Sequence, residues 1–287
     1  MRDERQTGWP DRIATLRTTA FGRASEEPYR RRVTDWIKLV VAALVLAGLT
    51  VRAAHPTALE VDFFRLIRDL PSPLSWTFRG LFAAGTLWAV GLAVAAAVIG
   101  RRKRLARDLL LAGVAAWATA HAMAALATGH GVLQSLHAVT HVRGVSPEFP
   151  LARVAIVVAV VSTAAPYLTR PTRRAGQVLV LVALVSALSE GAGLPNDVLG
   201  GAFLGLGIAA AVHLIFGSPG GRPTSAQVMA ALSEHGVDAT DIHLAEKQPR
   251  AATLMVGHDQ EGPIRVRVIG RDEADAQLLA KLWRFVV

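Results

Sequence analysis

Six apolar segments alternate with polar segments along residues 34–217. A membrane-spanning helix needs about 20 mainly apolar residues. The fifth segment is short and reaches this length only if the turn Ser189-Glu190-Gly191 lies in a pocket lined by protein. The pattern therefore predicts an all-α six-helix transmembrane bundle. Its spans are approximately Trp36–Ala54, Leu81–Gly100, Leu109–Thr128, Leu151–Leu168, Gly176–Leu188 and Asp197–Gly217.

Basic residues are concentrated in alternate polar segments. They fall at Arg30–Arg32 before the first span, at Arg101–Arg104 between the second and third, and at Arg170–Arg174 between the fourth and fifth. Loops rich in Lys and Arg stay cytoplasmic. We therefore expect a multi-pass protein of a bacterial cell membrane with both termini cytoplasmic, in which residues 1–33 form a basic tail.

Apolar residues also recur at helical spacing over Leu59–Leu70, with charged residues on the other face. Pro71 and Pro73 would end this helix. Its amphipathic pattern predicts a helix that lies on the outer membrane surface between the first two spans. In the sixth span, Gly201 and Gly205 have the spacing that lets another helix approach closely.

A turn-rich linker, residues 218–224, precedes a small α+β module over residues 225–287. The pattern predicts a helix at Ser225–His235, strands at Ala251–Gly257 and Ile264–Ile269 with a turn at Gly262-Pro263, and a helix from Asp272. A domain this small has a thin core. We expect this cytoplasmic module to be incomplete, so that the chain continues beyond Val287 or the module finishes its core against a partner.

Composition supports a membrane protein. Only 18% of the 287 residues are charged and 52% are hydrophobic, with a net charge of +9, whereas soluble proteins carry roughly 25% charged residues. The absence of cysteine excludes disulfides, thiolate metal sites and a cysteine nucleophile. Six Trp and two Tyr do not suggest stacking on bases, so no nucleic-acid partner is expected. Homo-oligomerisation and fusion to a further membrane domain are both open.

The region around the sixth span resembles the third motif of the type 2 phosphatidic acid phosphatases. That motif is Ser-Arg, five residues, His, three residues, Asp, followed by a small-residue helix. Here Ser186 and Asp197 keep the spacing, and Pro195-Asn196-Asp197-Val198-Leu199-Gly200-Gly201 is very like the family. However, Ala187 stands at the arginine and Gly193 at the nucleophilic histidine.

The other two motifs are represented by single residues. Pro150 matches the proline of the second motif, Pro-Ser-Gly-His, but Arg153 stands at its histidine. Arg143 matches the arginine of the first motif. The resemblance covers residues 36–217 and implies a phosphatase fold that has lost its nucleophile and its general acid. We therefore expect no catalytic residue, no metal and no cofactor.

Anion binding could survive the loss of catalysis. Arg143 and Arg153, with Asp197 and Glu190 beside them, would form a pocket at the outer mouth of the bundle for the phosphate of a membrane lipid. The alternative is a set of internal ion pairs, with Asp197 capping the sixth helix. The leading hypothesis is a non-catalytic domain that binds a phosphorylated lipid headgroup or anchors the cytoplasmic module.

Two other functions compete with this hypothesis. An active lipid phosphatase or phosphotransferase would need a rearranged histidine, for which His137 and His141 are candidates. His121, His130, His137 and His141 could also form a weak metal site, but solvated or interfacial histidines are more common. His213, in the sixth span, is expected to be hydrogen-bonded within the bundle or to lie at its cytoplasmic edge.

The third function is a component of a lipid transporter or flippase. The C-terminal region resembles the start of the kinase-like module of actinobacterial lysylphosphatidylglycerol synthase-like fusion proteins, although Arg267 stands where that module has a lysine. This resemblance implies a role in envelope lipid biology.

Overall fold

The computed structural model describes residues 29–53, 58, 62, 72–98, 102–128, 149–190, 192–219, 225–248 and 253–268. These residues form two compact units. The helical unit contains Asp35–Phe216, and the second unit contains the described residues before Asp35 and after Phe216. The predicted surface helix at Leu59–Leu70 lies almost entirely outside the described residues, and the helix predicted from Asp272 lies wholly outside them.

A helix covers each apolar segment of the sequence. Four of these helices contain stretches long and apolar enough to cross a membrane, namely Val33–Ala53, Lys103–Leu126, Pro171–Ser189 and Pro195–Phe216. The apolar stretches Ala83–Ala96 and Ala152–Tyr167 are shorter, so six spans stay a prediction. The full bounds are α2 Val33–Ala53, α4 Ser72–Val98, α5 Lys103–Thr128, α7 Ala152–Ala164 continued by the 3-10 turn η1 Ala165–Tyr167, α8 Arg170–Ser189 and α9 Pro195–Phe216.

Prolines account for several helix ends. Pro171 and Pro195 lie in the first turns of α8 and α9, where a missing N–H breaks no helical hydrogen bond. Pro166 lies in η1, where α7 tightens and ends. Because α8 begins at Arg170 rather than at Gly176, it is 20 residues long. The prediction that the fifth segment needs the Ser189-Glu190-Gly191 turn to reach spanning length was therefore wrong.

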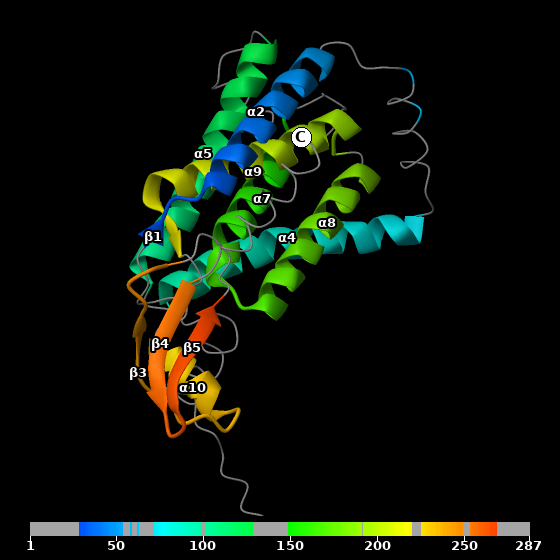
Figure 1. Cartoon of the computed structure of the whole chain (residues 1–287). Helices are drawn as coiled ribbons and strands as arrows, with labels where there is room; N and C mark the ends of the chain where they lie inside the picture. Colours follow the sequence, from blue (N-terminus) through cyan, green and yellow to red (C-terminus); the bar gives the residue numbers. More distant parts are fainter. Residues whose placement is uncertain are drawn as a thin grey trace, which may run out of the picture. The chain divides into compact units, whose positions relative to one another are not determined.

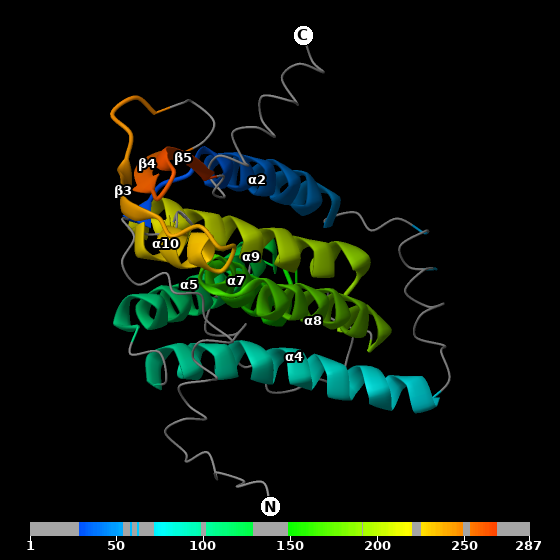
Figure 2. The same ribbon diagram turned by 60° about the horizontal axis from the view of Figure 1, so that its bottom comes forward.

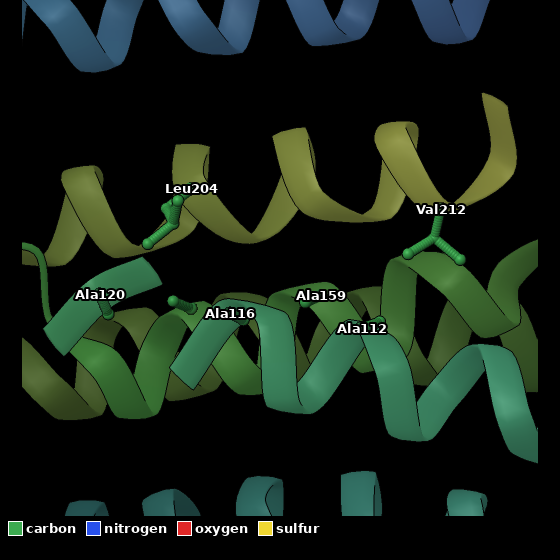
Figure 3. Close-up of a cluster of buried hydrophobic side chains, with 7 residues drawn as sticks. Ala112, Ala116, Ala120, Ala159, Leu204 and Val212 are labelled. Atoms are coloured by element: carbon green, nitrogen blue, oxygen red, sulfur yellow. The ribbon is translucent and has the colours of Figure 1, made fainter. Parts of the chain in front are cut away.

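The core of the helical unit is a seam of small side chains between α5, α7 and α9 (Figure 3). Alanines recur every four residues on α5 and face alanines of α7, and two larger aliphatic side chains of α9 close the seam. In a membrane, helices associate through van der Waals packing, which small residues improve by letting the backbones approach. The buried members are Ala112, Ala116, Ala120, Ala155, Ala159, Leu204 and Val212.

Glycines bring α9 into backbone contact with α7. A Cβ atom at Gly201 would lie 2.5 Å from the carbonyl oxygen of Leu151, and one at Gly205 would lie 2.6 Å from that of Ala155. No side chain fits at either distance. The predicted packing role of these two glycines is therefore confirmed.

The outer helices attach to this core on two opposite sides. Figures 1 and 2 show α2 alongside α9, and Figure 2 shows α4 on the far side of α7 and α8 from α2. Small residues again mark the contacts. A Cβ at Gly207 of α9 would lie 3.3 Å from the Cβ of Ala42 on α2, and one at Gly85 of α4 would lie 3.3 Å from that of Ala183 on α8.

Large apolar side chains cover the outside of these helices. On α2 they include Trp36, Val40, Leu44 and Val51, each at least half exposed. Contiguous apolar surface of this kind is rare on soluble proteins, whereas in a bilayer it faces lipid. The surface agrees with a membrane location.

The described part of the C-terminal module, residues 225–248 and 253–268, contains a helix and a three-stranded antiparallel sheet. Helix α10 (Ser225–Ser233) confirms the helix predicted there. The strands are β3 (Thr240–Leu244), β4 (Thr253–Asp259) and β5 (Gly262–Val268), in the order β3-β4-β5. Val228, Ile242 and Met255 form a separate small core.

The hairpin between β4 and β5 differs from its prediction. Asp259 pairs with Gly262 and His258 with Pro263, so Gln260 and Glu261 form the turn. The predicted turn at Gly262-Pro263 was therefore wrong. Proline is tolerated there because β5 is an edge strand of the described sheet.

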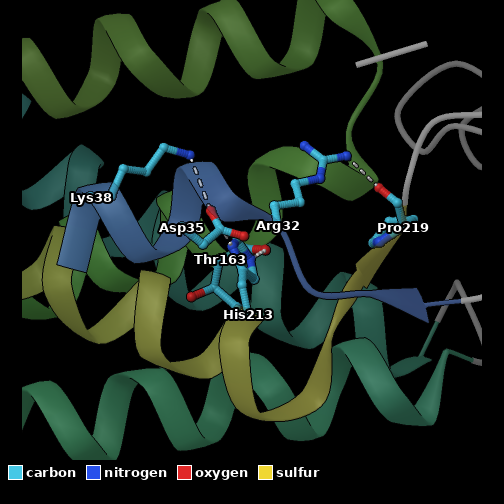
Figure 4. Close-up of polar contacts among 6 residues, drawn as sticks. All are labelled: Arg32, Asp35, Lys38, Thr163, His213 and Pro219. Atoms are coloured by element: carbon cyan, nitrogen blue, oxygen red, sulfur yellow. Dashed lines mark hydrogen bonds and ion pairs between the residues drawn. The ribbon is translucent and has the colours of Figure 1, made fainter. Parts of the chain in front are cut away.

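A two-residue ladder joins the chain on either side of the helical unit. Strand β1 (Tyr29–Arg30) pairs antiparallel with β2 (Ser218–Pro219). The Arg32 guanidinium also donates a 2.9 Å hydrogen bond from Nη2 to the carbonyl oxygen of Pro219 (Figure 4). The segment that precedes α2 thus belongs with the segment that follows α9.

Candidate functional site

Asp197, at the predicted outer site, is part of the N-terminus of α9. Its Oδ2 accepts a 2.8 Å hydrogen bond from the backbone N–H of Leu194, which lies just before the helix. This is the half of a capping box in which a third-position carboxylate reaches back to the N-cap amide. The side chain is buried. Asp197 therefore has the capping geometry of the structural alternative.

The residues around Asp197 are tightly packed. A Cβ at Gly193 would lie 3.0 Å from the Cβ of Asp197, and the carbonyl oxygen of Asp197 accepts a 3.0 Å hydrogen bond from the N–H of Leu151. Two residues later Arg153 is exposed. The structure thus brings Gly193, Asp197 and the start of α7 together.

The remaining predicted residues contribute less to this picture. Glu190 ends α8, where its backbone N–H bonds to the carbonyl oxygen of Ser186. Arg143 lies outside the described residues, as do His130, His137 and His141. His121 lies within α5, and its Nδ1 is 2.8 Å from the carbonyl oxygen of Trp117.

A second polar cluster lies at the opposite end of the helical unit, where α2, α5 and α8 begin and α7 and α9 end. We call this end the basic end, because the arginine runs of the sequence adjoin it. Asp35 in the first turn of α2 and His213 in the last turn of α9 are both buried. Lys38 Nζ is 3.2 Å from Asp35 Oδ1, and His213 Nδ1 is 3.9 Å from the same oxygen (Figure 4).

The imidazole of His213 connects α2 with α7 through α9. Its Nε2 is 3.1 Å from the carbonyl oxygen of Thr163. A carbonyl can only accept, so Nε2 carries a proton and Nδ1 is the nitrogen that faces the carboxylate. The prediction that His213 is hydrogen-bonded within the bundle is confirmed.

Three further contacts lie at the basic end, among residues of α5, η1 and α9. Asp108 is buried and accepts hydrogen bonds of 2.9 and 3.1 Å from Arg107 and one of 3.4 Å from the Tyr167 hydroxyl. The Arg107 guanidinium lies 4.3 Å from the ring centroid of Phe216, within cation–π range. These residues hold the helix ends together.

A cavity of about 330 Å³ lies between α2, α7, α8 and α9. Its polar lining is gathered at the basic end, where Asp35, Lys38, Arg173, Gln177 and His213 contribute. Deeper along the helices the lining is aliphatic and includes Val158, Val180, Leu184, Ala202 and Leu206. The cavity is therefore amphipathic along its length.

The cavity offers binding groups and lacks the parts of a metal centre. Within the described ranges, no group of three or more His, Asp or Glu side chains could hold a metal ion. The polar side chains are two cations, one carboxylate, one imidazole, one amide and the hydroxyl of Ser162. An amphiphile with an anionic head fits this set better than a neutral or cationic molecule.

Sequence reasoning did not find this site. Its residues come from four helices, and Asp35 and His213 are 178 positions apart in the numbering. One signal was present: Asp35 and Lys38 are ionisable residues at the edge of an apolar segment, which marks a candidate functional position in a membrane protein.

Comparison with known proteins adds no relative: no protein-family model, no curated protein and no solved structure matches the chain.

Proposed function

We propose that the helical unit is a non-catalytic membrane domain that binds a phosphorylated lipid and anchors the C-terminal module at the cytoplasmic face. The observation that carries the proposal is the amphipathic cavity. Its cationic groups lie at one end and its aliphatic walls follow the helix axes. A lipid has the same division between an anionic head and an apolar tail.

The dimensions of the cavity support a lipid. Arg173 and Leu184 both line it from α8, and they are about 17 Å apart along the helix at a rise of about 1.5 Å per residue. A volume of 330 Å³ is at the lower limit of small-molecule pockets, about 300–1,000 Å³. Such a slot suits a headgroup and part of one chain, with the rest of the lipid in the bilayer.

The absence of catalysis in this proposal rests on the residues at the motif positions of the phosphatases that the sequence resembles. Gly193 and Ala187 supply neither a nucleophile nor a cation. A histidine at position 193 would also meet Asp197, because even a Cβ would lie 3.0 Å from the Asp197 Cβ. The outer end of α9 is thus built as a packed helix terminus.

Native mass spectrometry of the detergent-extracted protein tests the proposal. We expect a co-purifying phosphorylated lipid and no release of phosphate from added lipid phosphates. Leu206→Trp would fill the cavity and remove the lipid. Leu181→Trp is the matched control, because Leu181 is 62% exposed on α8 and does not line the cavity.

Two results would contradict the proposal. Lipid-free wild-type protein would leave only the anchoring role. Phosphate release that disappears in a His137/His141 double alanine variant would instead establish the rearranged phosphatase.

A second candidate, a component of a proton-linked lipid transporter, is favoured by the Asp35–His213 pair. Buried ionisable pairs in membrane helices often carry protons, and Nδ1 of His213 faces the Asp35 carboxylate at 3.9 Å. Reconstituted vesicles with a fluorescent lipid analogue would test it. Lipid movement that depends on a proton gradient and is lost in His213→Gln would favour transport, whereas movement at the rate of protein-free vesicles would exclude it.

A further inference from the structure

The two cations of the cavity are in different electrostatic situations. Lys38 is 3.2 Å from Asp35, so its ammonium already has a carboxylate partner. The guanidinium of Arg173 makes no hydrogen bond or ion pair with any residue in the described part of the chain. Arg173 is half-buried and lines the same cavity from the opposite helix. An arginine held in a cavity wall without a partner is available to an anion.

We propose that Arg173 is the primary phosphate-binding residue of the cavity. Lys38 is a second cation, and its ion pair with Asp35 weakens its attraction for the phosphate. This assignment rests on the proposed lipid-binding function and places the phosphate at the basic end, opposite to the outer pocket predicted from Arg143, Arg153, Asp197 and Glu190. The ligand class is a phosphate-bearing molecule, and the aliphatic wall beyond Arg173 favours a lipid phosphate over free phosphate.

The chemistry of Arg173 and of its neighbour Gln177 fits a phosphate. The planar guanidinium donates two parallel N–H bonds to two phosphate oxygens, which an ammonium cannot do. Arg173 lies in the first turn of α8, where the helix dipole adds positive potential. Gln177, one turn further along α8, also lines the cavity and can donate from its amide.

Asp35 has a positioning role in this arrangement. It is buried beside Lys38 and lowers the net positive charge of the cavity by one unit. Removal of that charge in Asp35→Asn would leave Lys38 free to bind the anion. The variant should therefore bind phosphate more tightly, whereas a purely structural Asp35 would give weaker or unchanged binding.

Calorimetric titration of the full-length protein in detergent tests the assignment. The probes are dioctanoyl phosphatidic acid, dioctanoyl phosphatidylcholine as the zwitterionic lipid, and inorganic phosphate as the free anion. Loss of a charge-assisted hydrogen bond costs enough that Arg173→Gln should weaken phosphatidic acid binding by about tenfold or more. Arg173→Lys should recover only part of the loss, and Asp35→Asn should increase affinity.

Arg174→Gln is the matched control, because Arg174 is the adjacent, exposed arginine and does not line the cavity. It should bind phosphatidic acid like the wild type. Unchanged affinity in Arg173→Gln, or an equal loss in Arg174→Gln, would overturn the assignment even if lipid binding itself persists. Tighter binding of inorganic phosphate than of phosphatidic acid would show that the ligand is the free anion. Failure of the wild type to bind any of the three probes would overturn the proposed function as well.

Discussion

At the scale of single residues, Gly201 and Gly205 set the distance between α9 and α7. The carbonyl oxygens of Leu151 and Ala155 occupy the positions that side chains would need. Backbone atoms cannot move aside as a flexible side chain can. These two positions are therefore less tolerant of substitution than other glycines of the helices.

We predict that Gly205→Ala destabilises the helical unit by about 1–3 kcal/mol, the usual cost of overpacking. The added methyl group would lie 2.6 Å from the Ala155 carbonyl oxygen. The protein in detergent would be heated, and size-exclusion chromatography would measure the fraction that stays folded at each temperature.

Gly48→Ala provides the control, because a Cβ at Gly48 on α2 has no atom within 4 Å. Alanine is a better helix former than glycine, so this variant should unfold at the wild-type temperature or slightly above it. Equal losses in both variants would contradict a specific contact between α9 and α7.

At the scale of elements, hydropathy located the helices well and their ends less well. Apolar runs mark where a helix lies, but Ser72 and Arg170 begin helices within polar sequence, where no apolar boundary gives a signal. Strand β3 is a different case. Its sequence, TDIHL, is mainly polar, and it places only Ile242 in the core, so it lacks a clear alternating pattern.

The small core of the C-terminal module, to which β3 contributes Ile242, leads to a prediction about the stability of the module. Ile242→Ala removes the buried side chain of β3 and should cost about 2–5 kcal/mol, which a module with so small a core can hardly tolerate. Limited proteolysis of the full-length protein should then cut within residues 225–268 and leave the helical unit intact, because the two units have separate cores.

Leu244→Ala is the matched substitution on the same strand. Leu244 is 57% exposed, so the variant should resist the protease like the wild type. Simultaneous degradation of both units in Ile242→Ala would show that their stabilities are coupled.

At the scale of the whole molecule, the predicted orientation can be tested directly, because the chain has no cysteine of its own. If α8 crosses the membrane with the basic end inside, Ala192→Cys should react with a membrane-impermeant maleimide in intact cells. Arg174→Cys should react only after the membrane is permeabilised. Both positions are exposed in the structure.

The labelling pattern has two contradicting outcomes. Reaction of Arg174→Cys alone in intact cells would reverse the orientation, and reaction of both would show that α8 does not cross. Arg104→Cys, at the start of α5, should follow Arg174→Cys, because both adjoin the basic end.

The candidate site shows why the sequence alone does not predict which residues of different helices come together. The motif at Asp197 is contiguous along the chain, and its resemblance to a phosphatase motif predicts a site at the end of the bundle where α9 begins. The cavity instead combines residues of α2, α7, α8 and α9 that are far apart in the sequence, and no spacing rule connects Lys38 with Arg173. Only packing of the helices, set by buried glycines and alanines, brings these residues to one place.

The short ladder between β1 and β2 gives the helical unit the character of an insertion. The chain leaves the ladder at Arg30 and returns to it at Ser218, and these two residues are paired. In this arrangement one domain can be inserted into a loop of another. The whole set of helices could accordingly be exchanged for another set with neighbouring ends, while the antiparallel ladder formed by the two flanking strands kept its pairing.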